Sequence, residues 1–336
     1  MRAAVHSALG AVLFALAGAA AAQTPAPPAK PIQRPLGSVP LMVPPSDAAK
    51  KSCDTTCLTD LARHYADALA RQDGSALPWA ERVRYAENGV PIMVGDGTWA
   101  TATAHGAAPL IIADAGAGKV VWMGTVEEHG QPGFYAFELT APGGRIVAVQ
   151  ALIRRKEGRP PFGDPVAFAH NPAFSARVAK ATPRAARAGL VTAYLDAQAG
   201  KGKAPAFGKG CLLIENGTPM TGNLPAGKGE KGDCATSFSH HLFGEFEGVR
   251  RRVVAYDEAR GLVVVSGIRD LPAEKTAFTA TDGMPYKAEA DYPRSMGFMT
   301  VFKIEGGAIA RVETVATELP YLMPPPWPEP REGKSR

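Results

Sequence analysis

The hydrophobic positions of this chain recur with two periods, and each period predicts a different kind of element. Between residues 57 and 70 the apolar side chains return every three or four positions, which predicts a helix whose buried face holds Leu58, Leu61, Tyr65, Ala68 and Leu69. Residues 83–87 alternate instead and predict a strand, and the following Asn88-Gly89 is typical of a tight turn with positive φ. Further strands are predicted at 110–113, 119–126, 134–140 and 146–154. A helix followed by a curved antiparallel sheet indicates the α+β class.

The same order of blocks occurs a second time, so the chain contains an internal repeat. Tyr65 and Glu87-Asn88-Gly89 in the first copy correspond to Tyr194 and Glu215-Asn216-Gly217 in the second. The Tyr and the Glu are 22 positions apart in the first copy and 21 apart in the second. In the second copy the helix is predicted at 190–199 and the strands at 249–256, 262–268, 297–305 and 309–317. We therefore expect two diverged copies of one α+β domain, packed side by side.

The first 22 residues have the three-part pattern of a secretory signal. Arg2 supplies the positive charge, an apolar stretch runs from residue 8 to residue 17, and small residues lead up to Ala22, after which we expect cleavage. The alternative is a transmembrane anchor, but the apolar stretch is short for one. A lipoprotein needs a cysteine at the cleavage site, and the first cysteine of this chain is Cys53. We expect a periplasmic or secreted protein with no membrane span in its mature part.

Four cysteines fall into two local pairs, Cys53 with Cys57 and Cys211 with Cys234. Four cysteines allow three pairings, and we expect the local one because each pair lies within one predicted copy. The alternative is a metal site of four thiolates, but the spacing is poor for a zinc ribbon and an oxidising compartment favours disulfides. The sequence therefore predicts two disulfides and no metal.

Composition sets the remaining boundaries of the chain. The segment after the signal is rich in Pro and Ala and predicts an extended linker, and a Pro-rich, charged tail ends the chain. A second Pro-rich segment separates the two copies. The predicted divisions are a signal peptide at 1–22, a linker at 23–51, a first domain at 52–158, a linker at 159–172, a second domain at 173–322 and a tail at 323–336.

Four segments of the first copy have a recognisable pattern: residues 63–69, Asp73-Gly74, residues 83–89 and the closing segment 137–152. Together they resemble the SnoaL/ketosteroid isomerase-like superfamily, also called nuclear transport factor 2-like. The paired Glu-Asn-Gly motifs, the Gly-Asp-Gly-x-Trp segment at 95–99 and the final Leu319-Pro320-Tyr321 resemble a secreted tandem branch of unknown function. The resemblance covers residues 52–322 and implies, for each copy, a helix-backed curved sheet that forms a cone around an apolar pocket. Unrelated activities use this fold, so it implies no single chemistry.

The resemblance assigns two pairs of side chains to the cones. Tyr65 and Tyr194 stand where the isomerase has its oxyanion-hole tyrosine, and Asn88 and Asn216 stand where it keeps its general-base carboxylate. An amide cannot take a proton at neutral pH, so the isomerase mechanism does not transfer intact. The alternative is structural, because a core tyrosine can hydrogen-bond a turn and Asn before Gly is what a tight turn needs.

Two further pairs of positions belong to the expected cone mouths. Glu87 and Glu215 come just before the two Asn residues, and we expect both to point out of the cone because adjacent side chains of a strand face opposite ways. The protonated aspartic acid of the isomerase falls near Tyr135 in the first copy and near Thr300 in the second. The mouths are therefore expected to hold Tyr and Asn hydrogen-bonding groups without an obvious base.

Two candidates for a base belong to the second copy. His240-His241 lies close to Glu245 in the sequence, and His241 would share a face with Glu245 in either a helix or a strand, which suits acid–base work. The alternative for this cluster is a solvated polar face. Glu313, on the last predicted strand, is expected to face the second cone and to serve as a base there.

The charge pattern does not favour a nucleic-acid partner. The net charge is +5 and the basic residues are scattered; the run at 250–252 would alternate between the faces of a strand. With no nucleotide motif, P-loop or nucleophile elbow, we expect no cofactor. We expect an exported enzyme, a lyase, isomerase or hydrolase, that acts on a small apolar oxygenated compound in a cone-shaped pocket. The alternative is a non-catalytic binding module for an apolar ligand or an exported protein partner. The candidate site residues are Tyr65, Asn88, Tyr194, Asn216, His241 and Glu313.

Overall fold

The structure of the chain is a computed structural model. All residues that it describes belong to one compact unit, Gly37–Arg336. The predicted signal peptide at 1–22, the linker at 23–51 and His241 lie outside the described residues, so those predictions stay predictions. The described residues are 53–156, 161–222, 230–231, 233–239, 246–273, 277–279, 285–287 and 292–326.

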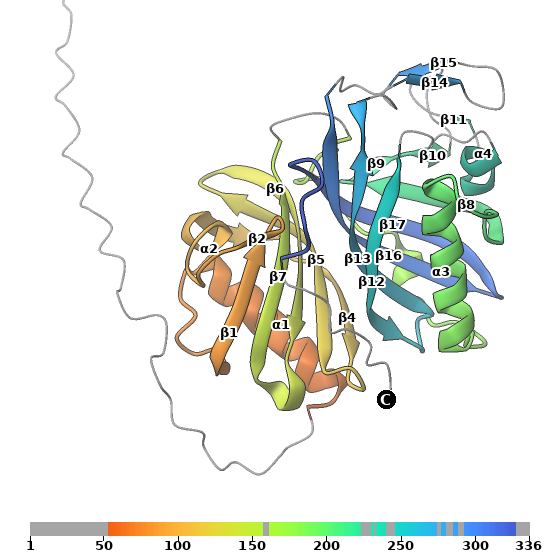
Figure 1. The fold of residues 1–336 in the computed structure, drawn as a ribbon. Helices are drawn as coiled ribbons and strands as arrows, with labels where there is room; N and C mark the ends of the chain where they lie inside the picture. Colours follow the sequence, from red (N-terminus) through yellow and green to blue (C-terminus); the bar gives the residue numbers. More distant parts are fainter. Residues whose placement is uncertain are drawn as a thin grey trace, which may run out of the picture. The chain divides into compact units, whose positions relative to one another are not determined.

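The first copy consists of one long helix and a seven-stranded sheet (Figure 1). Helix α1 (Thr55–Ala70) begins where the Asp54 carboxylate accepts a hydrogen bond of 2.9 Å from the Cys57 backbone N–H. The other elements are β1 (Trp79–Glu87), β2 (Val90–Pro91), α2 (Thr98–Thr101), β3 (Ala102–His105), β4 (Leu110–Asp114), β5 (Lys119–Glu128), β6 (Gln131–Thr140), the 3-10 turn η1 (Pro142–Gly144) and β7 (Ile146–Arg154). The strand order is β2-β1-β7-β6-β5-β3, with β4 paired to β5.

The second copy repeats this plan with a six-stranded sheet. Its main elements are α3 (Arg184–Gln198), β8 (Phe207–Glu215), β9 (Thr218–Pro219), β12 (Gly248–Asp257), β13 (Leu262–Leu271), β16 (Arg294–Glu305) and β17 (Ala308–Leu319). Shorter elements are η2 (Pro172–Phe174), β10 (Thr221–Gly222), β11 (Glu230–Lys231), α4 (Cys234–Ser239), β14 (Ala277–Thr279) and β15 (Pro285–Lys287). The strand order is β12-β13-β16-β17-β8-β9, in which the last five strands match β5, β6, β7, β1 and β2 of the first sheet, and β12 lies where β3 and β4 pair with β5.

The predicted α+β class is confirmed, with one difference in strand direction. Both sheets are mixed, because β1 runs parallel to β7 and β8 runs parallel to β17, while the other pairs of the two large sheets are antiparallel. Alternation of apolar and polar residues reports which face of a strand is buried, but it carries no information on the direction of the neighbouring strand. The sequence therefore could not distinguish a mixed sheet from the antiparallel one that we expected.

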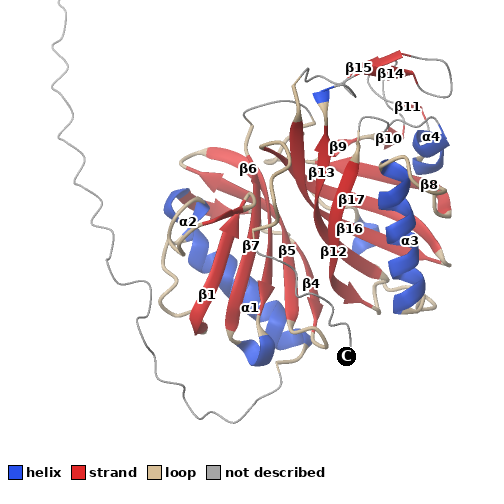
Figure 2. Ribbon diagram, viewed as in Figure 1, coloured by secondary structure: helices blue, strands red, loops and turns tan. Residues whose placement is uncertain are grey.

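Each large sheet is covered on both faces. One face of the first sheet packs against α1 and contributes Trp122 to that core, while the neighbouring Val121 packs on the opposite face together with Val264 of the second sheet. Adjacent residues of a strand face opposite ways, so a single strand serves both cores. The second sheet packs its other face against α3 (Figure 2). The interior of each cone is therefore the space between a sheet and its own helix.

Both predicted disulfides are confirmed, Cys53–Cys57 at the start of α1 and Cys211–Cys234 between β8 and α4. Disulfides are typical of proteins that fold in an oxidising compartment, which fits a location outside the cytoplasm. Within the described part of the chain, no helix has both the length and the apolar character needed to cross a membrane.

Candidate functional site

Tyr65 lies on α1 among the aromatic side chains of the first cone. Its ring centroid is 4.5 Å from that of Phe137, 5.3 Å from Trp99 and 6.1 Å from Trp79. The indole Nε1 of Trp99 donates a hydrogen bond of 2.9 Å to the Tyr65 hydroxyl. Burial raises the pKa of Tyr65 far above its ordinary value, and the Trp99 hydrogen bond opposes that rise without cancelling it. The hydroxyl is therefore protonated at neutral pH.

Glu87 points into the first cone, which corrects the expectation that it points outward. Its side chain is 7% exposed, the Tyr85 hydroxyl donates to its Oε2 at 3.1 Å, and the Thr98 backbone N–H donates to the same oxygen at 3.0 Å. Tyr85 and Glu87 are two residues apart on β1 and share the face that packs in the α1 core. Asn88 lies beyond the end of the strand, so its side chain does not define the inward face.

The Gly-Asp-Gly-x-Trp segment closes over Glu87. Gly97 has φ of 61°, and a Cβ at this position would lie 2.7 Å from Glu87 Oε1, so a larger residue would collide with the carboxylate. The next two residues supply the Thr98 N–H that binds Glu87 and the Trp99 indole that binds Tyr65. The segment thus fills the first cone and uses the polar groups that a ligand would otherwise meet.

Three buried polar atoms in this interior have no hydrogen-bond partner among the described residues: Thr98 Oγ1, Trp122 Nε1 and Tyr135 Oη. Tyr85 is close enough to Tyr135 to act on its pKa, but the two hydroxyls do not reach hydrogen-bonding geometry. Burial raises the pKa of Tyr135 well above its ordinary value. Together with Phe137, these fully buried aromatic side chains make the first cone a packed core.

Asn88 and Asn216 do the same structural work in the two copies. The Asn88 side-chain amide accepts from the Ile153 N–H at 2.9 Å and donates to the Ile153 carbonyl at 3.2 Å. Asn216 makes the same two bonds to Ala316, at 2.9 and 3.0 Å. Both residues have positive φ, 47° and 46°. Each side chain therefore extends the pairing of two neighbouring strands, β1 with β7 in the first copy and β8 with β17 in the second. This shared role explains why Glu-Asn-Gly occurs twice.

The second cone keeps a small cavity of about 10 Å³. Tyr194, from α3, is buried there and accepts a hydrogen bond of 3.3 Å from Gln198 Nε2. Burial raises the pKa of Tyr194 well above its ordinary value, and Arg269 opposes that rise. Thr300 and Thr314 share a hydrogen bond of 2.9 Å. The lining consists of Tyr194, Leu195, Gln198, Leu213, Glu215, Arg269, Phe298, Thr300 and Thr314.

Arg269 and Glu215 form an ion pair at this cavity that the sequence analysis missed. Arg269 Nη2 lies 3.5 Å from Glu215 Oε2, and its guanidinium lies 4.9 Å from the ring centroids of both Phe246 and Phe298. Glu215, like Glu87, lines the inside of its cone rather than pointing out of it. Arg269 Nε and Gln198 Oε1 are buried without a hydrogen-bond partner among the described residues. A charged residue within the apolar run of β13 was the available signal, since buried charges are rare unless they are paired.

Glu313 faces the first sheet, which corrects the expectation that it faces the second cone. The neighbouring Val312 belongs to the core under α3, so the side chain of Glu313 lies on the opposite face of β17. There the Glu313 carboxylate contacts Nδ1 of His170, whose Nε2 lies 3.1 Å from the Met123 carbonyl of the first sheet. Sequence reasoning gave His170 no role. In the structure this pair links the two copies.

The described residues contain no group of three His, Cys, Asp or Glu side chains arranged to hold a metal ion. A family model described as a domain of unknown function (DUF8021) matches residues 180–316, in the second copy and in less than half of the chain. A comparison with curated proteins gave no match.

Three solved structures are similar to parts of the chain. One is an NTF2-like protein of unknown function from Cytophaga hutchinsonii, 11% identical, with a TM-score of 0.23 over 40% of this chain and 100% of that chain. Another, described as a SnoaL-like polyketide cyclase from Jannaschia sp., is 13% identical, with a TM-score of 0.25 over 39% of this chain and 85% of that chain. The third is the C. albicans Mtr2-Mex67 M domain complex, 13% identical, with a TM-score of 0.22 over 40% of this chain and 94% of that chain.

Both copies have the helix-backed sheet that the superfamily resemblance implies. The fold that the resemblance predicts is therefore confirmed, and the secreted tandem branch stays a prediction.

Proposed function

We propose that this is an exported small-molecule-binding protein whose ligand site is the second cone, within a domain at 173–322. Tyr194, Glu215 and Arg269 are the groups that meet the ligand. The observation that carries the proposal is the polar lining of the cavity, in which Arg269 Nε and Gln198 Oε1 are buried without hydrogen-bond partners among the residues that the structure describes. Buried polar atoms are costly unless they are satisfied, so a ligand that supplies the missing bonds is stabilised.

The size of the cavity limits which part of a ligand enters it. A volume of about 10 Å³ admits a group no larger than a water molecule, such as a carbonyl or hydroxyl oxygen. Arg269 and the protonated Tyr194 hydroxyl are the donors for that oxygen, and Glu215 is the acceptor. The apolar body of the ligand therefore stays outside this volume, and only its oxygen-bearing end enters. The preferred ligand is therefore a small apolar compound with one oxygen-bearing end.

The same groups supply what a lyase or isomerase needs. Donors directed at a carbonyl oxygen stabilise the negative charge that develops there, at about 3 kcal/mol for one well-placed donor. Glu215, rather than Asn216, is the side chain that can take a proton, because it is a carboxylate and lines the cavity. Turnover of the ligand is the second candidate function. Binding without turnover is favoured by the 3.5 Å ion pair between Glu215 and Arg269, because that contact already engages the carboxylate that turnover would need.

The two copies provide matched variants for the test. The purified mature protein is screened by thermal shift against small aromatic, terpenoid and steroidal carbonyl compounds and ethers, since a compound that binds the native state raises the melting temperature. We expect Tyr194→Phe and Glu215→Gln to abolish the shift given by a hit, and Tyr65→Phe and Glu87→Gln, in the packed first cone, to keep it. Product analysis on the hit then separates turnover from binding. Loss of the shift in the first-cone variants alone, or no hit across the library, would contradict the proposal.

A further inference from the structure

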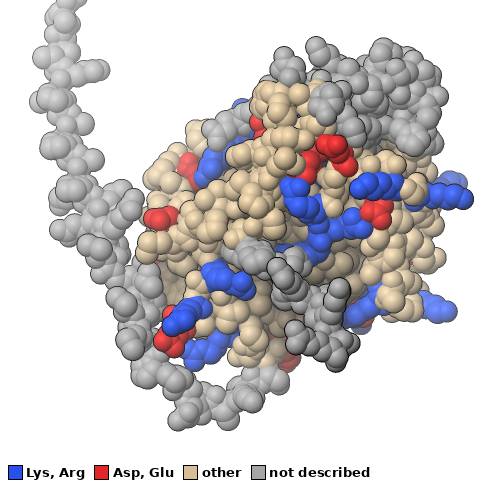
Figure 3. Space-filling view, in the orientation of Figure 1, with Lys and Arg blue, Asp and Glu red and all other residues tan. Residues whose placement is uncertain are grey.

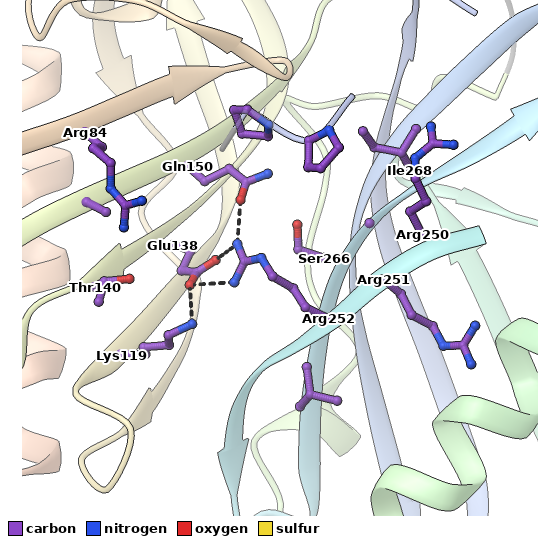
Figure 4. A pocket seen from close by; sticks show the side chains of 15 residues that line it. Arg84, Lys119, Glu138, Thr140, Gln150, Arg250, Arg251, Arg252, Ser266 and Ile268 are labelled. Atoms are coloured by element: carbon purple, nitrogen blue, oxygen red, sulfur yellow. Dashed lines mark hydrogen bonds and ion pairs between the residues drawn. The ribbon is translucent and has the colours of Figure 1, made fainter. Parts of the chain in front are cut away.

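A pocket of about 670 Å³ lies between the two sheets, away from both cones. Its walls come from β1, β5, β6 and β7 of the first copy, from β12 and β13 of the second, and from Pro325 and Pro326 (Figure 4). Small-molecule sites in proteins measure roughly 300–1,000 Å³, so this pocket is of ligand size. Elsewhere the same two sheet faces meet through a continuous apolar core. The space is therefore a local gap in an otherwise packed contact.

Positive charge dominates the lining of this pocket. Five lining side chains are cationic and one is a carboxylate: Arg84, Lys119, Arg250, Arg251 and Arg252 against Glu138. Two further carboxylates pair with lining arginines from outside the pocket, Asp270 with Arg250 and Asp196 with Arg251. Figure 3 shows Lys and Arg side chains gathered in the middle of one face of the molecule.

The wall around Glu138 is already organised. Arg252 donates to both carboxylate oxygens of Glu138, and its Nη1 lies 2.9 Å from Oε1. Arg252 also donates to Gln150 Oε1 at 2.5 Å. Lys119 Nζ lies 3.0 Å from Glu138 Oε1. Burial acts to raise the pKa of Glu138, but Arg252 and Lys119 together hold it below its ordinary value. The carboxylate is therefore ionised at neutral pH, and Arg252 and Lys119 both pair with it.

The other lining groups suit an anion that carries an apolar body. Arg250 donates to Asp270 and, at 3.0 Å, to the Met323 carbonyl, and its Nε is buried without a hydrogen-bond partner among the described residues. Arg84 enters from the opposite wall, on β1. Apolar surface lies between these charges, at Ala148, Val253 and Ile268. Guanidinium groups favour carboxylates and phosphates because two parallel N–H groups match two oxygens.

We infer that this inter-sheet pocket binds a small organic anion, through a carboxylate or phosphate group held by the arginines, with its apolar part against the Ala148–Val253 side of the cavity. The site is separate from the second cone and does not depend on the function proposed there. Because both sheets supply lining residues, an anion bound here would also link the two copies to each other.

The test is calorimetric titration of the mature protein with citrate, benzoate, octanoate and inorganic phosphate at fixed ionic strength. Arg84→Gln is the main variant, since Arg84 is exposed and its replacement leaves the packed core intact. Arg82→Gln, two residues earlier on the same strand and outside the pocket, is the matched control. A lost charge-assisted contact is expected to weaken binding about tenfold or more in the first variant and to leave the second unchanged.

A second variant tests the cavity rather than the charge. Ala148→Leu places extra carbon atoms in the pocket without altering any ion pair, and we expect it to reduce binding of benzoate and octanoate more than that of phosphate. Inorganic phosphate, which has no apolar body, is expected to bind Tyr194→Phe as it binds the unaltered protein, which separates this site from the second cone. Binding of phosphate but not carboxylates, or the reverse, identifies the head group. No binding of any probe, or equal loss in Arg82→Gln and Arg84→Gln, would overturn the inference.

Discussion

Replacing Asn216 tests whether the repeated Glu-Asn-Gly motif holds the sheets together. The side chain is 1% exposed, makes the two bonds to Ala316 already described, and donates a third to the Pro161 carbonyl at 3.1 Å. Asn216→Ala leaves three backbone groups without these partners, at about 1 kcal/mol each. It also places Ala at φ of 46°, which costs about 1 kcal/mol more. We expect a loss of about 4 kcal/mol in the free energy of unfolding.

Asn88→Ala provides the comparison from the first copy. Asn88 makes two such bonds, to Ile153, and is half-buried, so we expect a loss of about 2–3 kcal/mol. Asn216→Gly separates the two contributions, because Gly removes the hydrogen bonds but adopts positive φ readily. We expect Asn216→Gly to lose about 3 kcal/mol, less than Asn216→Ala.

Urea unfolding followed by circular dichroism measures these losses, and tryptophan fluorescence follows the first copy through Trp79, Trp99 and Trp122. Because a chain that contains two copies of a domain can depart from two-state unfolding, the two signals are analysed independently. A loss below about 1 kcal/mol for Asn216→Ala would refute the role in strand pairing. Unaltered stability in Asn216→Gly would assign the effect to backbone strain instead of hydrogen bonds.

Three further changes have expected outcomes that the same unfolding assay can measure. Gly97→Ala should cost about 1–2 kcal/mol more than Gly95→Ala, because both have positive φ but only the first places its Cβ 2.7 Å from a carboxylate oxygen. Glu138→Gln should cost about 3 kcal/mol at pH 7, and progressively less as the pH falls through the folded-state pKa of Glu138. The pKa of Glu138 in the folded protein lies below its ordinary value. The ionised carboxylate therefore stabilises the folded protein at pH values above the ordinary pKa, and this stabilisation is lost as the pH falls through the folded-state pKa. Reduction of Cys211–Cys234, which closes a separation of 23 residues, should cost about 3 kcal/mol and lower the melting temperature measured with and without reductant.

The fold could be predicted because its signals are local and occur twice. The helical spacing around Tyr65 and the Asn-Gly turns depend on a few neighbouring residues, and the repeat allowed each copy to support the other. The parallel pairing of β1 with β7 could not be predicted in this way, since it joins segments that are 67 positions apart at their first residues, Trp79 and Ile146. Nothing in either strand alone distinguishes a parallel neighbour from an antiparallel one.

The site was harder to predict because the inward face of a strand end depends on where the strand stops. We took Asn88 as inward and so placed Glu87 outward, whereas Asn88 has left the strand and Glu87 follows the parity of Tyr85. The same reasoning misplaced Glu313. The side of the sheet on which its side chain lies is determined by the alternation of side chains along the whole of β17. Arg269 was missed because its partner, Glu215, comes from a strand more than fifty positions earlier. Long-range pairs of this kind are fixed by topology, which one sequence does not state.

A single position accounts for much of the difference between the two cones. Arg269 is the eighth residue of the ten-residue strand β13, and the eighth residue of the matching strand β5 is Val126, which lies in the first core. A buried arginine requires a counter-charge, and Glu215 supplies it, so the second cone retains a polar interior. With valine at that position, Glu87 has no cation opposite it on β5. Its partners are Arg155, 4.0 Å from Oε1, the Tyr85 hydroxyl and the Thr98 N–H, which brings the Gly97 turn into the cone. The same Glu-Asn-Gly motif thus leads to a closed interior beside valine and to a polar cavity beside arginine.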